Sequence, residues 1–132
     1  MKALLAGLLL AGASAVAGAE PCPQPVDVTQ ADLLGLWHAE FDGLAQGATL
    51  LLERHPEYAQ SLRGGINRNG ERGLVAADIE DGALTLEESA DGRRIDATWL
   101  GEVVEGSCGR EIRGTWLPRD EDAARSFVLR KR

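Results

Sequence analysis

Short runs in which apolar and polar residues alternate fill the chain from about residue 34 to its C-terminus. In one of them, Leu84 and Leu86 alternate with Thr85 and Glu87. A period of two residues is typical of a β-strand with one buried and one exposed face. No long segment shows the period of 3.6 residues that marks an amphipathic helix. The pattern therefore predicts eight strands, at about residues 34–41, 48–54, 61–68, 73–79, 83–89, 93–104, 109–117 and 124–131.

Two-residue turn signals separate several of these runs. Asn69-Gly70, Asp81-Gly82 and Asp91-Gly92 favour tight hairpins, because a type I′ turn needs a positive φ at both central positions. We expect each dipeptide to join two neighbouring antiparallel strands. A short turn at 31–34 is also expected before the first strand, because residues 29–32 suit its cap.

Eight strands joined in order by short turns predict an all-β fold, an eight-stranded antiparallel up-and-down β-barrel. Such a sheet closes on itself and leaves no unpaired edge. In the strand at 93–104, we expect the inward positions to start at Ile95. Small residues at inward positions would let larger side chains fill a narrow interior; they are Gly64, Ala76, Ala97, Gly101 and Gly114. The sequence leaves open whether that interior is packed or hollow.

The first 19 residues have the organisation of a cleavable secretory signal peptide. Lys2 supplies a positive start, an uncharged run follows, and Ala17-Gly18-Ala19 supplies the small residues that a signal peptidase needs. The alternative is a membrane anchor, but this apolar run is shorter than the ~20 residues that span a bilayer. We therefore expect a signal peptide at 1–19, a Pro-rich N-terminal segment at 20–33 and a barrel domain at 34–132. No membrane insertion is expected after cleavage.

The charge balance narrows the range of partners. The chain has 21 acidic and 14 basic residues, and removing Lys2 with the signal peptide changes the net charge from −7 to −8. Nucleic acids and anionic membranes attract basic surfaces. We therefore expect no nucleic-acid partner. The arginines are scattered among Asp and Glu, which is typical of a solvated surface.

The chain has two cysteines, Cys22 and Cys108. In an oxidising compartment, two cysteines most simply form one disulfide. Closing so long a loop stabilises a fold by roughly 4–5 kcal/mol on the chain-entropy model. The bridge would tie the Pro-rich segment at 20–33 to the barrel. A catalytic thiol is the alternative, and no spacing supports it. Together with the signal peptide, the predicted disulfide indicates a periplasmic or secreted protein.

No pattern in the chain predicts catalysis. The motifs of zinc proteases, serine hydrolases, phosphate-binding loops and dinucleotide-binding folds are absent from the sequence. Glu53, His55 and Glu57 are the alternative metal ligands, but a turn histidine flanked by surface acids is more often solvated. The pair Glu87-Glu88 points to opposite faces of a strand and so cannot supply two carboxylates to one cleft. We predict a protein that is not an enzyme and has no metal and no cofactor.

The motif Gly35-Leu36-Trp37 on the first strand resembles the G-x-W of the calycin superfamily, which includes lipocalins, fatty-acid-binding proteins, avidins and bacterial metalloprotease inhibitors. The resemblance implies that Trp37 closes one end of the barrel. It also implies that a basic residue of the last strand packs across this tryptophan, and Arg130 and Lys131 are the two candidates. A fold alone does not define a function.

Two Thr-Trp strands, residues 96–101 and 114–117, are similar to paired strands of avidin and streptavidin. In those proteins hydroxyl and amide groups satisfy the ureido group of biotin. The matching positions here are Ala39, Ile95 and Ala97, which offer no such groups. Leaving a buried ureido group unpaired costs several kcal/mol, so we do not expect tight biotin binding.

Two function classes remain. In the first, Trp37, Trp99 and Trp116 line an apolar pocket for a small molecule at the open end of the barrel; the alternative is that these tryptophans form core. In the second, the barrel binds a cell-envelope or extracellular protein, as a protease or lysozyme inhibitor does. The exposed turn with His55, Glu57 and Tyr58 is the candidate protein-contact loop, although an ordinary connection is its simpler interpretation. Association of barrels through their outer faces is left open.

Overall fold

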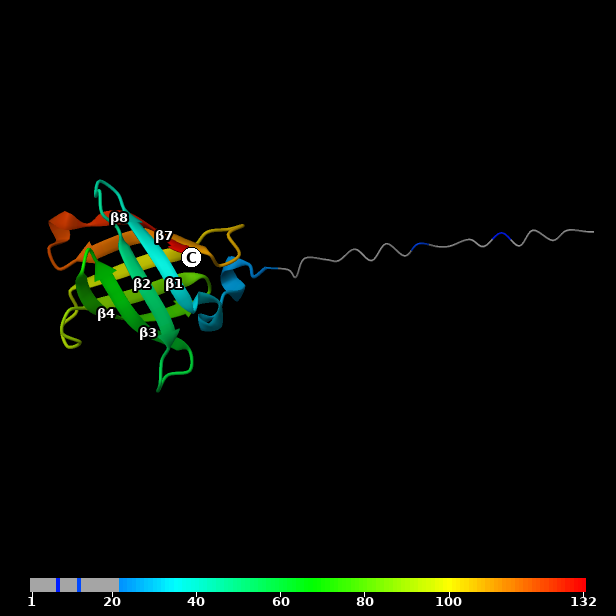
Figure 1. Ribbon diagram of the computed structural model, residues 1–132, viewed down its shortest axis with the longest axis horizontal. Coiled ribbons are helices and arrows are strands. Elements are labelled where there is room, and N and C mark those ends of the chain that lie inside the picture. Colours follow the sequence, from blue (N-terminus) through cyan, green and yellow to red (C-terminus); the bar gives the residue numbers. More distant parts are fainter. Residues whose placement is uncertain (1–6, 8–11, 13–21) are drawn as a thin grey trace, which may run out of the picture.

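The computed structural model describes residues 22–132, together with Gly7 and Gly12. The predicted signal peptide at 1–19 lies outside the described residues, apart from those two glycines. The described residues form a closed barrel of eight antiparallel strands (Figure 1). The elements are η1 (Pro25–Asp27), η2 (Gln30–Leu33), β1 (Gly35–Phe41), β2 (Ala48–Arg54), β3 (Ser61–Arg68), β4 (Glu71–Glu80), β5 (Ala83–Ser89), β6 (Ala97–Val103), β7 (Glu111–Pro118), η3 (Glu121–Ala123) and β8 (Arg125–Lys131).

Each strand pairs with the next one in sequence, and β8 pairs with β1 to close the barrel. The predicted up-and-down fold is therefore confirmed. Because successive strands run in opposite directions, the connections alternate between two ends (Figure 1). We call the end with the connections 42–47, 69–70, 90–96 and 119–124 the open end. The end with the connections 55–60, 81–82 and 104–110 is called the covered end.

Two of the three predicted hairpin turns are confirmed. Asn69 and Gly70 have φ values of 50° and 93°, and Asp81 and Gly82 have values of 50° and 81°. Positive φ at both positions matches the twist of the flanking strands.

The prediction of a tight turn at Asp91-Gly92 is wrong. Oδ1 of Asp91 accepts the amides of Arg93 at 2.8 Å and Arg94 at 3.0 Å. An aspartate that binds the backbone in this way holds a wider loop, so β6 begins at Ala97 and not at residue 93. As a result Ile95 lies in the loop and is exposed, contrary to the expectation that it faces inward.

Alternate residues of every strand face a single hydrophobic core. The largest fully buried side chains are Trp37, Trp99, Phe127, Leu33, Leu50, Leu52, Leu62, Leu84, Leu86, Ile112 and Leu129. Gly101 shows why small residues are needed here, because a Cβ on it would lie 2.7 Å from Cγ2 of Ile112. Besides Ile95, Ala76 was expected to face inward; the structure shows that Ala76 is exposed and its neighbour Ala77 is buried. The packed interior answers the question that the sequence left open.

The N-terminal segment lies across the covered end (Figure 1). The expected capped turn is present as η2, and the amide of Thr29 donates to Oδ2 of Asp32 at 2.9 Å. Val28 and Leu33 pack into the core. Nε2 of Gln30 donates to the carbonyl oxygen of Ala59 at 2.9 Å, which links the segment to the connection 55–60.

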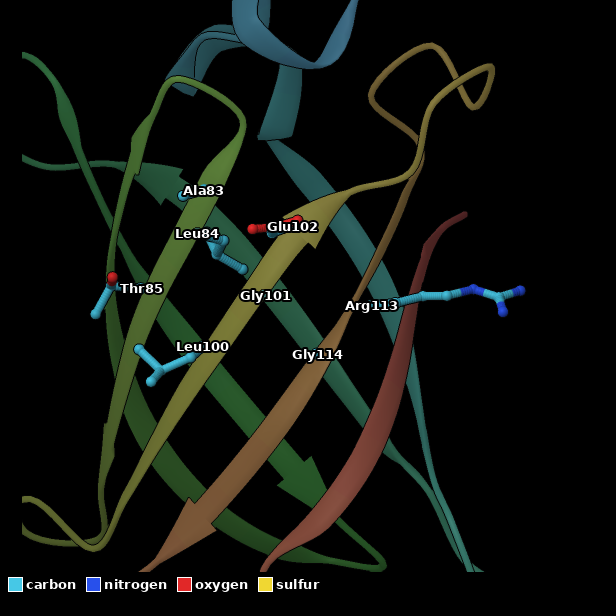
Figure 2. A pocket seen from close by; sticks show the side chains of 8 residues that line it. All are labelled: Ala83, Leu84, Thr85, Leu100, Gly101, Glu102, Arg113 and Gly114. Atoms are coloured by element: carbon cyan, nitrogen blue, oxygen red, sulfur yellow. The ribbon is translucent and has the colours of Figure 1, made fainter.

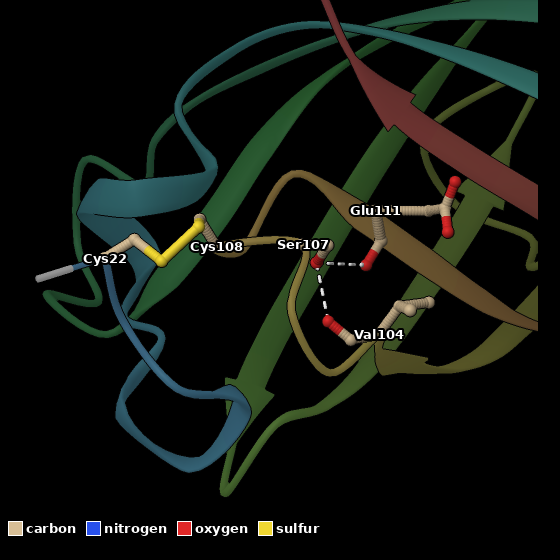
Figure 3. The surroundings of a disulfide bond; sticks show 5 residues. All are labelled: Cys22, Val104, Ser107, Cys108 and Glu111. Carbon is tan, nitrogen blue, oxygen red and sulfur yellow. Dashed lines mark hydrogen bonds between the residues drawn. A yellow bond between two sulfur atoms is a disulfide. The ribbon is translucent and has the colours of Figure 1, made fainter.

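The predicted disulfide between Cys22 and Cys108 is present. It joins the start of the described chain to the connection 104–110 (Figure 3). Within that connection, Oγ of Ser107 donates to the carbonyl oxygen of Val104 at 2.6 Å. A disulfide is typical of proteins that leave the reducing cytosol. Within the described residues, no helix is long and apolar enough to cross a bilayer.

Lys131 takes the position that the calycin resemblance implies for a basic residue. It is the cross-strand partner of Trp37. Its Nζ donates to the carbonyl oxygen of Asp32 at 2.7 Å, so the last strand is joined to η2. The other candidate, Arg130, is exposed and pairs with Glu111 at 2.8 Å.

Candidate functional site

The open end of the barrel holds two of the three tryptophans. Trp99 on β6 and Trp116 on β7 are directly opposite each other. The ring centroid of Phe41, at the end of β1, lies 5.3 Å from that of Trp99 and 5.2 Å from that of Trp116. Rings at these distances attract one another in tilted and edge-to-face arrangements. The structure therefore brings Trp99 and Trp116 together, with an added phenylalanine.

Trp37 does not belong to this group. It precedes Phe41 by four residues on β1, which is about 13 Å along a strand. Its Nε1 donates to the carbonyl oxygen of Leu33 at 2.8 Å, at the covered end. The three predicted ligand-binding tryptophans therefore occupy two separate places.

A buried carboxylate lies among the rings at the open end. Glu88 is on β5 and is 6 % exposed. Its Oε1 accepts hydrogen bonds from Nε1 of Trp99 at 2.9 Å and Nε1 of Trp116 at 2.7 Å. One oxygen atom thus orients both indoles. A buried charge needs such donors, because desolvation of an unpaired carboxylate is costly.

Arg68, the last residue of β3, neutralises Glu88. Its Nη2 donates to Oε1 at 2.7 Å and its Nη1 donates to Oε2, so the contact is bidentate. The guanidinium also lies over two rings, with Cζ 5.5 Å from the centroid of Phe41 and 5.2 Å from that of Trp116. Both distances are within the range of cation–π attraction. We call Phe41, Arg68, Glu88, Trp99 and Trp116 the mouth cluster.

The mouth cluster keeps Glu88 ionised. Burial alone would raise the pKa of this carboxyl group. The hydrogen bond from Arg68, the hydrogen bond from Trp116, the charge of Arg68 and the hydrogen bond from Trp99 together outweigh burial and hold the pKa below its ordinary value. Glu88 is therefore an ionised carboxylate that is paired with Arg68 and accepts hydrogen bonds from both indoles.

A cavity of about 190 Å³ adjoins the cluster, and we call it the vestibule. Arg68 and Glu88 line it, together with three other charged residues, Glu71, Arg72 and Asp96. The carboxylate of Asp96 is paired with Arg119 at 3.7 Å, outside the vestibule lining. The side chain of Arg68 is 31 % exposed, whereas that of Glu88 is 7 % exposed. Arg68 is therefore the part of the ion pair that solvent reaches.

A second hollow lies on the outer wall of the barrel and has a volume of about 420 Å³ (Figure 2). Thr85 and Leu100 face each other across β5 and β6 at its edge. Arg113 points away from it, and its Nε donates to Glu111 at 3.2 Å. Polar groups do not converge on this hollow, which makes the mouth cluster the stronger candidate site.

The predicted protein-contact loop lies at the covered end. Nδ1 of His55 accepts the amides of Glu57 and Tyr58, each at 3.1 Å. The rings of His55 and Tyr58 are 4.8 Å apart, and Tyr58 is exposed. The loop is therefore held in one shape by its own histidine. Across the described residues, no group of three or more His, Cys, Asp or Glu is placed to hold a metal ion.

The positions that match biotin contacts in avidins have different surroundings. Ala39 and Ala97 are buried and carry no polar side-chain atom. Ile95 lies in the exposed loop before β6. These three residues therefore contribute no hydrogen-bonding group to the mouth cluster.

Sequence reasoning missed both charged residues of the mouth cluster, although a signal for them exists. Leu84, Leu86 and Glu88 occupy alternate positions of β5, so the alternation places Glu88 inside. Ile66 and Arg68 follow the same rule at the end of β3. Opposite charges at inward positions at the same end of the barrel indicate a buried ion pair.

A comparison with known protein families matches none to this chain, and a search of curated proteins finds no relative. The described residues form a closed, disulfide-linked, eight-stranded antiparallel barrel, which is consistent with a calycin-like fold. Its function has to be argued from its own site.

Proposed function

We propose that this chain is an exported, non-catalytic binding protein that takes a small ligand at the open end of its barrel. The observation that supports this most strongly is the mouth cluster. A buried carboxylate, an arginine and three aromatic rings converge there from five strands. Convergent polar groups beside apolar surface are the usual composition of a ligand site.

The ligand fits the mouth and not the interior. The interior is filled by the core, so a long apolar molecule has no place along the barrel axis. At the mouth, Trp116 is half-buried, Phe41 is buried beneath the guanidinium of Arg68, and the vestibule adds about 190 Å³. We therefore propose a compact ligand with a polar part that reaches the charged groups of the vestibule and an apolar or aromatic part that contacts Trp116.

The proposed location is the periplasm or the extracellular space. The disulfide supports export, because such bonds persist in oxidising compartments. The sequence of residues 1–19 supports it independently.

A ligand screen by tryptophan fluorescence tests the proposal, with Trp37→Phe and Trp116→Phe as matched variants. A ligand at the open end changes the fluorescence of wild type and of Trp37→Phe, and its effect weakens at least fivefold in Trp116→Phe. The proposal fails if every ligand found acts through Trp37 and is insensitive to Trp116→Phe.

A second candidate function is binding of a cell-envelope or extracellular protein through the loop at 55–58. The observation in its favour is that His55 fixes the loop and leaves Tyr58 exposed. A fixed loop loses little conformational entropy on binding, and tyrosine is frequent at interface hot spots. Pull-down of envelope proteins with wild type and with Tyr58→Ala tests it: a partner lost only from Tyr58→Ala supports this function.

A further inference from the structure

We propose that Arg68 is an internal occupant of a cation site, and that a ligand carrying a guanidinium group displaces it from Glu88. The inference rests on the proposed function, because it specifies the chemistry of a ligand at the mouth. The site in question is the carboxylate of Glu88 together with the ring faces of Phe41 and Trp116.

The fixed part of the site matches a planar cation. Both carboxylate oxygens of Glu88 are used by one guanidinium, in the parallel geometry that this group prefers. Glu88 itself is anchored by Trp99 and Trp116 and does not depend on Arg68 for its orientation. If Arg68 leaves, the carboxylate and the rings still form a cage for a second guanidinium.

Arg68 has another partner available when it leaves. Glu71 is directly opposite it in the β3–β4 pairing, and both residues line the vestibule. Side chains opposite each other on neighbouring strands have Cβ atoms about 5 Å apart. Glu71 is exposed, so Arg68 can turn from Glu88 to Glu71 without burying an uncompensated charge. The exchange thus replaces one ion pair with two.

The surroundings favour an incoming cation. Glu71 and Glu88 line the vestibule, Asp96 there is paired with Arg119, and the whole chain has a net charge of −7. A negative field raises the local concentration of cations and speeds their association. The vestibule volume of about 190 Å³ accommodates a guanidinium group on a short alkyl chain. Both a free guanidine compound and an arginine side chain of a partner protein present this group.

Calorimetric titration with methylguanidinium tests the proposal on the disulfide-bonded protein. The key variant is Arg68→Met, which keeps an unbranched chain over the rings and removes the internal cation. Because a competing internal group reduces apparent affinity by the fraction of empty sites, we expect Arg68→Met to bind at least tenfold more tightly than wild type. Glu71→Gln should weaken binding to wild type more than it weakens binding to Arg68→Met, because only in wild type does Glu71 also receive the displaced Arg68.

Three controls make the result specific. Methylurea has a similar shape without the charge and should bind neither protein. Arg63→Met removes an arginine from the outer face of the same strand and should behave like wild type. Adding Glu88→Gln to Arg68→Met should abolish binding. If Arg68→Met is poorly folded, the readout is its melting temperature, which methylguanidinium should raise and methylurea should not.

Failure of methylguanidinium to bind or to stabilise Arg68→Met overturns the inference. If ligands from the fluorescence screen still depend on Trp116 in that case, the proposed function stands and only the cation chemistry is wrong. An equal gain in affinity in Arg63→Met also contradicts it. A blocked peptide with one central arginine distinguishes the sources: tighter binding than methylguanidinium indicates a protein ligand, and weaker binding indicates a small molecule.

Discussion

The two ends of the barrel provide different hydrogen-bond acceptors for their tryptophans. Each end has buried tryptophan whose indole N–H needs an acceptor. At the covered end, Trp37 donates to the backbone carbonyl of Leu33. At the open end, Trp99 and Trp116 donate to the side-chain carboxylate of Glu88. The first acceptor is neutral and belongs to a segment that closes the barrel, whereas the second is charged.

The difference in acceptor has a functional consequence. A backbone carbonyl is satisfied by one or two donors and requires no counter-ion. A buried carboxylate requires a positive partner, and here that partner is the half-buried Arg68. The covered end is therefore held by main chain and a disulfide. At the open end, the charge of Glu88 is balanced by the side chain of Arg68, which we propose a ligand can replace.

We expect the largest loss of folding stability from removing the disulfide at the covered end. Replacing both Cys22 and Cys108 by Ser removes a link between residues 86 positions apart. The chain-entropy model gives a loss of about 4 kcal/mol in the free energy of unfolding. Urea denaturation followed by circular dichroism measures it. A loss below about 1 kcal/mol would show that the N-terminal segment holds its place without the bridge.

Arg68→Ala should have the next largest effect, at the open end. It leaves Glu88 buried without a counter-ion, and breaking a buried pair in this way costs about 3 kcal/mol. Arg63→Ala, on the outer face of β3, is the matched control and should cost less than about 0.5 kcal/mol. Equal losses in the two variants would contradict a special role for Arg68.

Trp37→Phe should destabilise the covered end by about 2 kcal/mol, because the carbonyl oxygen of Leu33 loses its donor inside the core. Trp116→Phe should cost about 1 kcal/mol, since Glu88 keeps its bonds to Trp99 and Arg68. The midpoints of urea denaturation show which of the two variants loses more stability. A reversed order would mean that the open end depends more on its indole than the covered end does.

The smallest expected effect is a loss of folding stability at acidic pH, because it depends on the protonation of one carboxyl group. The pKa of Glu88 is lower in the folded protein than in the unfolded chain. The resulting stabilisation is fully present well above the ordinary pKa of 4.5 and is lost as the pH falls through the lower folded value. The stability gap between wild type and Glu88→Gln should therefore shrink from pH 5 downward. A gap that is constant over this range would contradict an ionised Glu88.

The alternation of residues was sufficient to predict the strands and the barrel, because it shows which face of each strand is apolar. It failed at Ile95, where Asp91 binds two amides and turns a predicted strand into a loop. The alternation also predicted that Ala76 faces inward. Ala76 and Ala77 are both small and apolar, so the pattern does not show which of them is buried. Hydrogen bonds from a side chain to the backbone, like those of Asp91, cannot be predicted from strand propensities.

Two of the five residues of the mouth cluster were predicted as site residues from the sequence. Trp99 and Trp116 were identified from the sequence, and their neighbour Glu88 was seen only as a carboxylate without a partner. Its partner Arg68 is 20 residues away in sequence and two strands away in the barrel. The pairing depends on how far each strand is staggered around the closed sheet, and local pattern does not determine that stagger.

We propose that ligands enter at the open end and not at the covered end. Indole N–H resonances of the three tryptophans, recorded by nuclear magnetic resonance during titration with methylguanidinium, test it within one molecule. We expect the resonances of Trp99 and Trp116 to move together with added ligand, while that of Trp37 stays fixed. Movement of the Trp37 resonance alone would contradict entry at the open end, whereas no movement of any of the three would contradict only the binding of a guanidinium group.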